Sequence, residues 1–130
     1  MSTHVLDSWA VLRLLEDRAP TAKRVADLLE DDQAIMSWIN LGEVYYVTRG
    51  QHGEREADDV VRDLRSSLVL DPPSPARVLA AAALKAQHRM AYADAFAAAT
   101  AIAHDAVLLT GDPELLVPGA PWRTEDLRYE

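Results

Sequence analysis

The sequence contains no cysteine, which excludes a disulfide framework, a thiolate metal site and a cysteine nucleophile. The start of the chain lacks a basic segment followed by an apolar run, so we expect no signal peptide. No apolar stretch is long enough to cross a bilayer. These absences together predict a cytoplasmic protein that does not contact membranes.

Positive charge is also scarce. Thirteen Lys and Arg oppose 21 Asp and Glu, which gives a formal net charge of −8. A protein that binds nucleic acid by overall charge is expected to be basic. Any contact with nucleic acid must therefore depend on bound cations or on a local arginine cluster. The simpler interpretation is that the acidity only keeps a small protein in solution.

Several familiar catalytic patterns are missing. The chain has no glycine-rich phosphate loop and no serine in a nucleophile-elbow motif. Its four histidines show no ligand spacing, so we expect them to be structural or exposed: His4, His52, His88 and His104. The aromatic side chains of Trp38, Tyr45 and Tyr46 are more typical of a core or a dimer surface than of a base-stacking platform.

Short apolar runs alternate with longer helical patterns along the whole chain. The runs predicted as strands span residues 4–6, 34–37, 68–70 and 106–109, with a last strand around Trp122. Helical patterns cover residues 9–15, 38–47, 54–66 and 76–90. Two more helices are predicted to begin at Thr21 and at Asp94, and residues 49–53 are predicted to form a turn. Strands that are apolar and separated by helices indicate a parallel sheet covered on both faces. We find no linker or repeat and expect a single domain over residues 1–130.

The stretch from Ala91 to Pro113 organises this pattern. It begins with Asp94 at the head of an alanine-rich helix that is apolar all round, which predicts a buried helix. It ends with Asp112, just after the apolar run 106–109. An acid at the start of a buried helix requires a partner.

Four acids follow strands or begin helices in a way that predicts a shared location. Ligands of parallel sheets bind beyond the carboxyl ends of the strands, where the strand order reverses. The four acids expected there are Asp7, Glu43, Asp94 and Asp112. Each also has a simpler explanation: a helix N-cap for Asp7, a turn for Asp112, a helix-dipole contact for Asp94 and an apolar stem for Glu43.

Four converging carboxylates would repel one another, and some would be driven to bind protons. A divalent cation removes this conflict, and Mg²⁺ or Mn²⁺ prefers oxygen ligands. The pattern therefore favours metal-assisted hydrolysis of a phosphodiester. Bound cations would also attract a phosphate backbone to an acidic protein.

Four segments that contain these acids resemble the successive acidic motifs of PIN-domain ribonucleases, and most closely the VapC toxins of type II toxin–antitoxin systems. They occur in the family's order, as His4-Val-Leu-Asp-Ser8, Ile39-Asn-Leu-Gly-Glu-Val-Tyr-Tyr46, Ala91-Tyr-Ala-Asp-Ala-Phe-Ala97 and Leu109-Thr-Gly-Asp-Pro113. The resemblance implies a PIN-like three-layer α/β/α sandwich with a central parallel sheet.

The resemblance also implies a toxin with Mg²⁺- or Mn²⁺-dependent endoribonuclease activity, acting on RNA and inhibited by a cognate VapB-like antitoxin, and a homodimer. It implies that Asp7, Glu43, Asp94 and Asp112 are the catalytic and metal-binding residues. Asp7 and Asp94 match the positions of direct metal contact, and Ser8 and Thr110 match supporting positions.

Two other functions stay open from the sequence. A phospho-receiver signalling domain shares the parallel α/β build, and Asp71 after the run 68–70 could be its phosphorylated residue. However, Asp7 has no acidic neighbour, and no lysine follows Lys85. A PIN-like binding module without catalysis is the second alternative, although all four acids are present.

Overall fold

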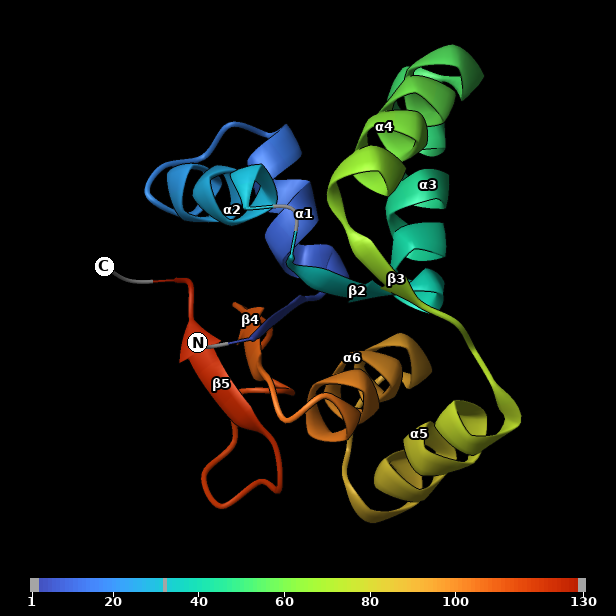
Figure 1. The fold of residues 1–130 in the computed structure, drawn as a ribbon, viewed down its shortest axis with the longest axis vertical. Helices are drawn as coiled ribbons and strands as arrows, with labels where there is room; N and C mark the ends of the chain where they lie inside the picture. Colours follow the sequence, from blue (N-terminus) through green and yellow to red (C-terminus); the bar gives the residue numbers. More distant parts are fainter. Residues whose placement is uncertain (1–2, 32, 129–130) are drawn as a thin grey trace.

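The structure is a computed structural model that describes residues 3–31 and 33–128. Strands and helices alternate along this part of the chain (Figure 1). The strands are His4–Leu6 (β1), Ile35–Ser37 (β2), Val69–Asp71 (β3), Val107–Thr110 (β4) and Arg123–Asp126 (β5). The helices are Ser8–Leu15 (α1), Thr21–Glu30 (α2), Trp38–His52 (α3), Glu54–Ser67 (α4), Pro75–Gln87 (α5) and Tyr92–Ala103 (α6).

The five strands form one parallel sheet in the order β3-β2-β1-β4-β5. The chain builds outward from β1 to β3, then returns to place β4 on the other side of β1. The strand order therefore reverses between β1 and β4, where Val5 pairs with Leu108. This confirms the expected parallel sheet and puts its switch point at the strands that precede Asp7 and Asp112.

Successive residues of the central strands point to opposite faces and divide the core in two. Val5 and Leu108 pack with residues of α5 and α6, whereas Leu6 and Leu109 pack with residues of α1, α2, α3 and α4. The sheet thus lies between two helical layers (Figure 1). The three-layer α/β/α sandwich expected from the resemblance is confirmed.

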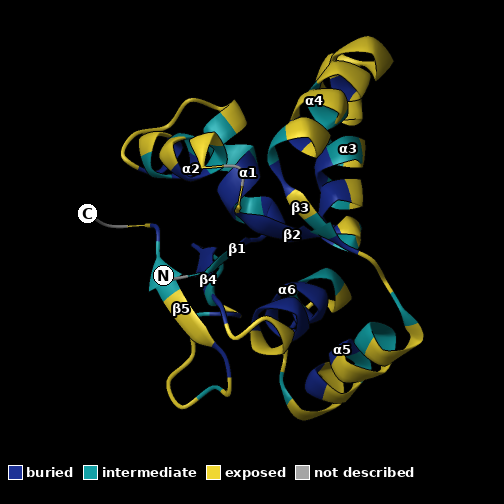
Figure 2. Cartoon of the chain, in the orientation of Figure 1, coloured by how far each residue is buried: buried dark blue, intermediate teal, exposed yellow. Residues whose placement is uncertain are grey.

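Helix α6 is enclosed by its neighbours, as its composition predicts. Every residue from Ala95 to Ala101 is buried (Figure 2). It packs against α5, α3 and the strands β1, β2 and β4. Small alanine side chains allow this close approach, so the position of α6 is set by contacts on several sides.

Helix α3 is longer than the sequence predicts. The turn expected at residues 49–53 is wrong, because the helix continues to His52 and the chain reverses at Gly53, whose φ is +93°. A helical glycine costs about 1 kcal/mol relative to alanine. At Gly50, packing of the buried Val44 and Thr48 on the same helix outweighs that cost.

Strand boundaries differ from the prediction by about one residue. Asp71 and Thr110 lie within β3 and β4 rather than after them, and Trp122 lies just before β5. Helix α5 begins at Pro75, one residue before the predicted start, where the Ser74 side chain accepts a hydrogen bond from the N–H of Arg77, and it ends at Gln87 rather than at Met90. None of the helices within residues 3–31 and 33–128 is long and apolar enough to span a membrane.

Candidate metal centre

Asp7 lies directly beyond the carboxyl end of β1 and is 1% exposed. Its Oδ1 accepts a hydrogen bond from the N–H of Ala10 at 2.8 Å, so it caps α1. Its Oδ2 accepts a short hydrogen bond from the hydroxyl of Thr110, at the end of the neighbouring strand β4. The N-cap interpretation is therefore right, and the same carboxylate also faces the adjacent strand end.

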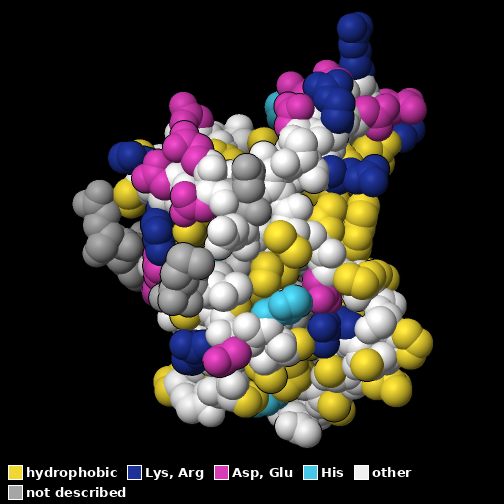
Figure 3. All heavy atoms as spheres, viewed as in Figure 1, with side chains coloured by type: hydrophobic (Ala, Val, Ile, Leu, Met, Phe, Trp, Pro, Cys, Tyr) yellow, Lys and Arg dark blue, Asp and Glu magenta, His cyan; other side chains and the backbone are white. Residues whose placement is uncertain are grey.

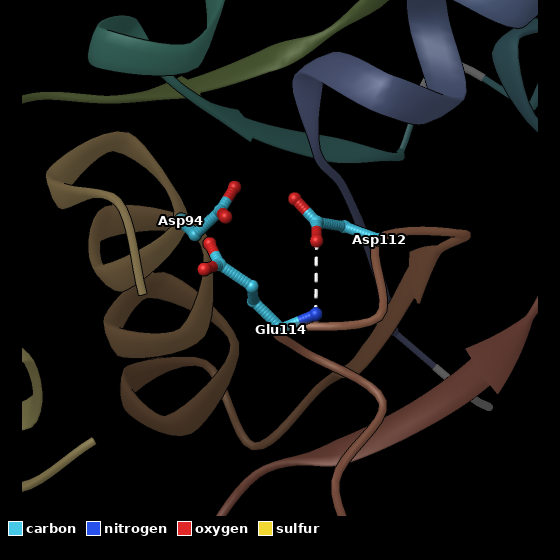
Figure 4. A group of neighbouring side chains, drawn as sticks. All are labelled: Asp94, Asp112 and Glu114. Carbon is cyan, nitrogen blue, oxygen red and sulfur yellow. Dashed lines mark hydrogen bonds between the residues drawn. The ribbon is translucent and has the colours of Figure 1, made fainter. Parts of the chain in front are cut away.

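Asp94 and Asp112 approach each other from α6 and from the loop after β4 (Figure 4). Together with Glu114 they offer one carboxylate oxygen each, and these three oxygens lie within 4.8 Å of one another. The main-chain N–H of Asp112 donates to Thr110 Oγ1 at 3.0 Å. Thr110 thus orders both Asp7 and the loop that carries Asp112.

Glu114 is a member of this cluster that the sequence did not predict. Its N–H donates to Asp112 Oδ1 at 2.9 Å, and its Oε1 accepts from the N–H of Ala91 at 3.2 Å. The loop after Asp112 turns back toward α6, and that turn brings a third carboxylate to the site. The only sequence signal is an acid two residues after Asp112, which is common in exposed loops.

The charges of the site act on one another and change its acidity. Burial raises the pKa of Asp7 to about 7, and the negative charges of Asp112 and Glu43 add to this effect, outweighing the hydrogen bonds from Thr110 and Ala10. Burial also raises the pKa of Asp94 to about 8, with further contributions from Asp112, Asp7 and Glu43. Asp7 and Asp94 therefore both feel the charges of Asp112 and Glu43. Of the four predicted acids, only Asp94 and Asp112 belong to the group whose oxygens lie within 4.8 Å of one another, and Glu114 is its third member.

No described Lys or Arg forms an ion pair with Asp7, Glu43, Asp94 or Asp112. Acids elsewhere differ: they gather over α2 and α4 among Lys and Arg side chains (Figure 3), and Asp27 pairs with Lys23. The site acids are thus left without a cation from the described chain. Carboxylate oxygens as the only charged donors fit Mg²⁺ or Mn²⁺ better than softer metals.

A PIN domain model matches residues 4–118, most of the chain. This chain belongs to the PIN domain family. A comparison with curated protein sequences gives no significant match.

Solved structures share the same fold over almost the whole chain. The DNA-bound VapBC complex of Salmonella typhimurium matches with a TM-score of 0.76 at 18% identity, over 98% of this chain and 99% of that one. VapBC-1 of nontypeable Haemophilus influenzae matches with a TM-score of 0.72 at 20% identity, over 96% of this chain and 98% of that one. The Mycobacterium tuberculosis toxin VapC20 is described as cleaving the Sarcin-Ricin loop. It matches with a TM-score of 0.71 at 16% identity, over 90% of this chain and 95% of that one.

The two residues expected to support the site, Ser8 and Thr110, make different contacts in this PIN domain. Thr110 contacts Asp7 directly, whereas the buried Ser8 donates from its hydroxyl to the main-chain carbonyl of Asn40 at 3.1 Å. Ser8 therefore links α1 to α3 and has no hydrogen bond to the acids. Any support that it gives to the site is indirect.

Asp71, the residue considered for a phospho-receiver, lies in the edge strand β3 of the PIN domain. Its Oδ2 accepts from Arg77 Nε at 2.7 Å, and its Oδ1 lies 2.8 Å from His104 Nε2. Burial acts to raise the pKa of Asp71, but the hydrogen bonds from Arg77 and His104 outweigh it, and the pKa is lowered. A buried carboxylate with both oxygens occupied is unsuited to accept a phosphoryl group.

The aromatic residues of α3 do not form a core. Tyr46 is 64% exposed and Trp38 36%, and the Tyr45 hydroxyl donates to Asp58. For these residues the core interpretation is wrong. Trp38 lies under the guanidinium of Arg65, 5.1 Å from the ring centre.

Gly111, between Thr110 and Asp112, has no room for a side chain. A Cβ at this position would overlap the Trp9 ring, which also packs against the hydrophobic core and lies 4.7 Å from the Arg13 guanidinium. We expect Gly111→Ala to destabilise the protein by about 1–3 kcal/mol, because the ring or the loop must move. Urea unfolding measures this. Gly42→Ala, where the added Cβ meets no atom within 4 Å, is the control, and equal midpoints for wild type and Gly111→Ala would contradict the clash.

Stability without metal should depend on pH through Asp7 and Asp94. Their pKa values in the folded protein, about 7 and about 8, exceed the ordinary 3.8. At pH values between 3.8 and about 8 the folded protein holds protons that the unfolded chain has released, so the free energy of unfolding falls as pH rises. We expect the Tm in EDTA to decrease from pH 5.5 to 8.5.

The slope of Tm against pH in a variant shows which carboxyl group causes the decrease. Asp94→Asn should flatten the fall in Tm, because asparagine carries no titrating proton. Acids whose pKa is lowered, such as Asp71 and Glu125, lose their contribution only at more acidic pH, outside this range. Identical slopes for the variant and the wild type would show that Asp94 is not the titrating group.

Proposed function

We propose that this chain is the toxin component of a type II toxin–antitoxin system and acts as an Mg²⁺- or Mn²⁺-dependent endoribonuclease. The observation that carries the proposal is the cluster of unpaired carboxylates at the switch point of a PIN fold. The likeness to VapBC complexes, and to a toxin described as cleaving the Sarcin-Ricin loop, supports RNA as the substrate.

Each site residue would have a distinct role in binding the cation. Asp7, Asp94 and Asp112 would hold the cation, with Glu43 and Glu114 adding negative charge around it. A divalent cation held there would lower the pKa of an attacking water and would neutralise charge on the phosphodiester. Thr110 keeps the Asp7 carboxylate in place through its hydroxyl, and it keeps Asp112 in place by accepting its N–H.

The helix that carries Asp94 adds to this arrangement. Asp94 lies in the first turn of α6, where the positive end of the helix dipole favours its ionised form. Burial and neighbouring acids oppose ionisation more strongly. A cation is therefore the missing charge that would let both Asp7 and Asp94 ionise near neutral pH.

The partner in this proposal is a VapB-like antitoxin, because the similar structures include toxin–antitoxin complexes from several bacteria. A homodimer is part of the same proposal. Both follow from likeness to those proteins and are tested by co-purification with the product of a neighbouring short reading frame.

The decisive experiment is RNA cleavage by the purified protein with Mn²⁺, after treatment with chelator, and after Mn²⁺ is restored. We expect cleavage, its loss, and its recovery. A PIN-like binding module without catalysis would retain RNA under all three conditions and leave it intact. Mapping the 5′ ends of cellular RNA after induction then identifies the target.

A further inference from the structure

Asn40 joins the three helices that lie next to site acids. It is fully buried in α3, one helical turn before Glu43. Its Nδ2 donates to the main-chain carbonyl of Ala93 in α6 at 3.0 Å. Its own main-chain carbonyl accepts from Ser8 of α1 at 3.1 Å. Ala93 precedes Asp94 and Ser8 follows Asp7, so one residue connects the segments that carry three of the four acids.

Stability alone does not account for an asparagine at this place. Its Oδ1 is buried and has no hydrogen-bond partner among the described residues. A buried acceptor left unpaired costs about 1–3 kcal/mol, which offsets the gain from the Nδ2 bond. An apolar side chain of similar size would fill the same space without that cost.

The side chains on α6 explain why the amide of Asn40 matters for the position of this helix. From Ala95 to Ala101 this helix presents mainly alanine methyl groups, which are short and make no directional contact. Ala91, the residue before the helix, makes no side-chain cap, and its N–H donates to Glu114, which ties the helix start to the loop after β4 and not to α3. The hydrogen bond from Asn40 to the Ala93 carbonyl is the directional contact that holds the first turn of α6, and Asp94 with it, relative to Glu43 on α3.

We propose that Asn40 is a positioning residue of the metal centre, which holds Asp94 and Glu43 in the relative arrangement that binds a divalent cation. This inference rests on the proposed function. Asn40 does not touch the cation or the RNA in this role. It acts through the placement of the helices that carry the acids.

The test compares Mn²⁺ affinity with stability in Asn40→Leu. Isothermal titration should give an Mn²⁺ dissociation constant about tenfold higher than in the wild type, typical of losing an interaction that orients metal ligands. The Tm in EDTA should stay within a few degrees, because leucine removes the unpaired acceptor. RNA cleavage at limiting Mn²⁺ should fall with affinity and recover in part at saturating Mn²⁺. If Asn40→Leu does not fold, Asn40→Ala replaces it.

Thr100→Val is the matched control. Thr100 is buried in α6, and its hydroxyl donates to the carbonyl of Phe96 in the same helix at 2.7 Å. The variant loses one buried hydrogen bond but no link between acid-bearing segments. We expect a lower Tm with the Mn²⁺ dissociation constant within about twofold of the wild type, which is about 0.4 kcal/mol.

Each outcome separates the two proposals. Equal Mn²⁺ affinity in the wild type, Asn40→Leu and Asn40→Ala overturns the positioning role and leaves the metal centre standing. A tenfold loss in Thr100→Val also overturns it, because general loosening of α6 would then explain the effect. A wild-type protein that binds no Mn²⁺ refutes the metal centre itself, and the positioning role with it.

Discussion

Asp94→Asn is expected to lower RNA cleavage by roughly 100- to 1,000-fold, the range typical of removing one electrostatic contact at a reacting centre. The same change should raise the Tm measured in EDTA at pH 8. It removes a half-buried carboxylate whose pKa is raised by burial and by Asp112, Asp7 and Glu43. Loss of activity with gain of stability is the result expected of a functional residue. Single-turnover cleavage and thermal unfolding measure the two effects.

Asp27→Asn is the control for the change in net charge. Asp27 is exposed on α2 and pairs with Lys23 at 3.2 Å. Its loss should leave cleavage unchanged and should not stabilise the protein. If Asp94→Asn cleaves RNA at the rate of Asp27→Asn, Asp94 has no part in the reaction.

Saturation with Mn²⁺ should produce the largest change in stability. A ligand at 100 times its dissociation constant stabilises the folded state by about 2.7 kcal/mol. For a chain of this length that corresponds to a rise in Tm of about 10 °C. The shift should be larger at pH 8.5 than at pH 6, because Asp7 and Asp94, with pKa values of about 7 and about 8, must release protons to bind metal.

Two comparisons check the origin of this shift. Potassium chloride at equal ionic strength screens repulsion without binding specifically, so its effect should be small. Asp94→Asn should lose most of the Mn²⁺ response. A Tm that does not respond to millimolar Mn²⁺ at either pH would rule out a preformed centre.

The sequence predicts the sheet and the placement of Asp7 and Asp112 because both depend on local patterns. Short apolar runs mark the strands, and the carboxyl ends of adjacent parallel strands must meet. Asp94 is predictable for a similar reason, since an acid at the head of an apolar helix requires a partner.

Features that depend on long-range packing were not predictable. Glu114 joins the cluster only because the loop after Asp112 folds back to Ala91. Asn40 gains its role from contacts with Ser8 and Ala93, which lie 32 and 53 positions away in the chain. The extent of α3 was missed because tertiary packing outweighs the local signal of Gly50. In each case the deciding partner is remote in sequence.

The strand order also controls when the acidic cluster can form during synthesis of the chain. Thr110 and Asp7 form their hydrogen bond across 103 positions, and β1 at the centre of the sheet pairs with β4. Because domains fold as units and such pairings form late, a ribosome-bound chain that lacks β4 cannot assemble the site. The carboxylates of Asp7, Asp94 and Asp112 therefore come together only after residues 107–112 have left the exit tunnel.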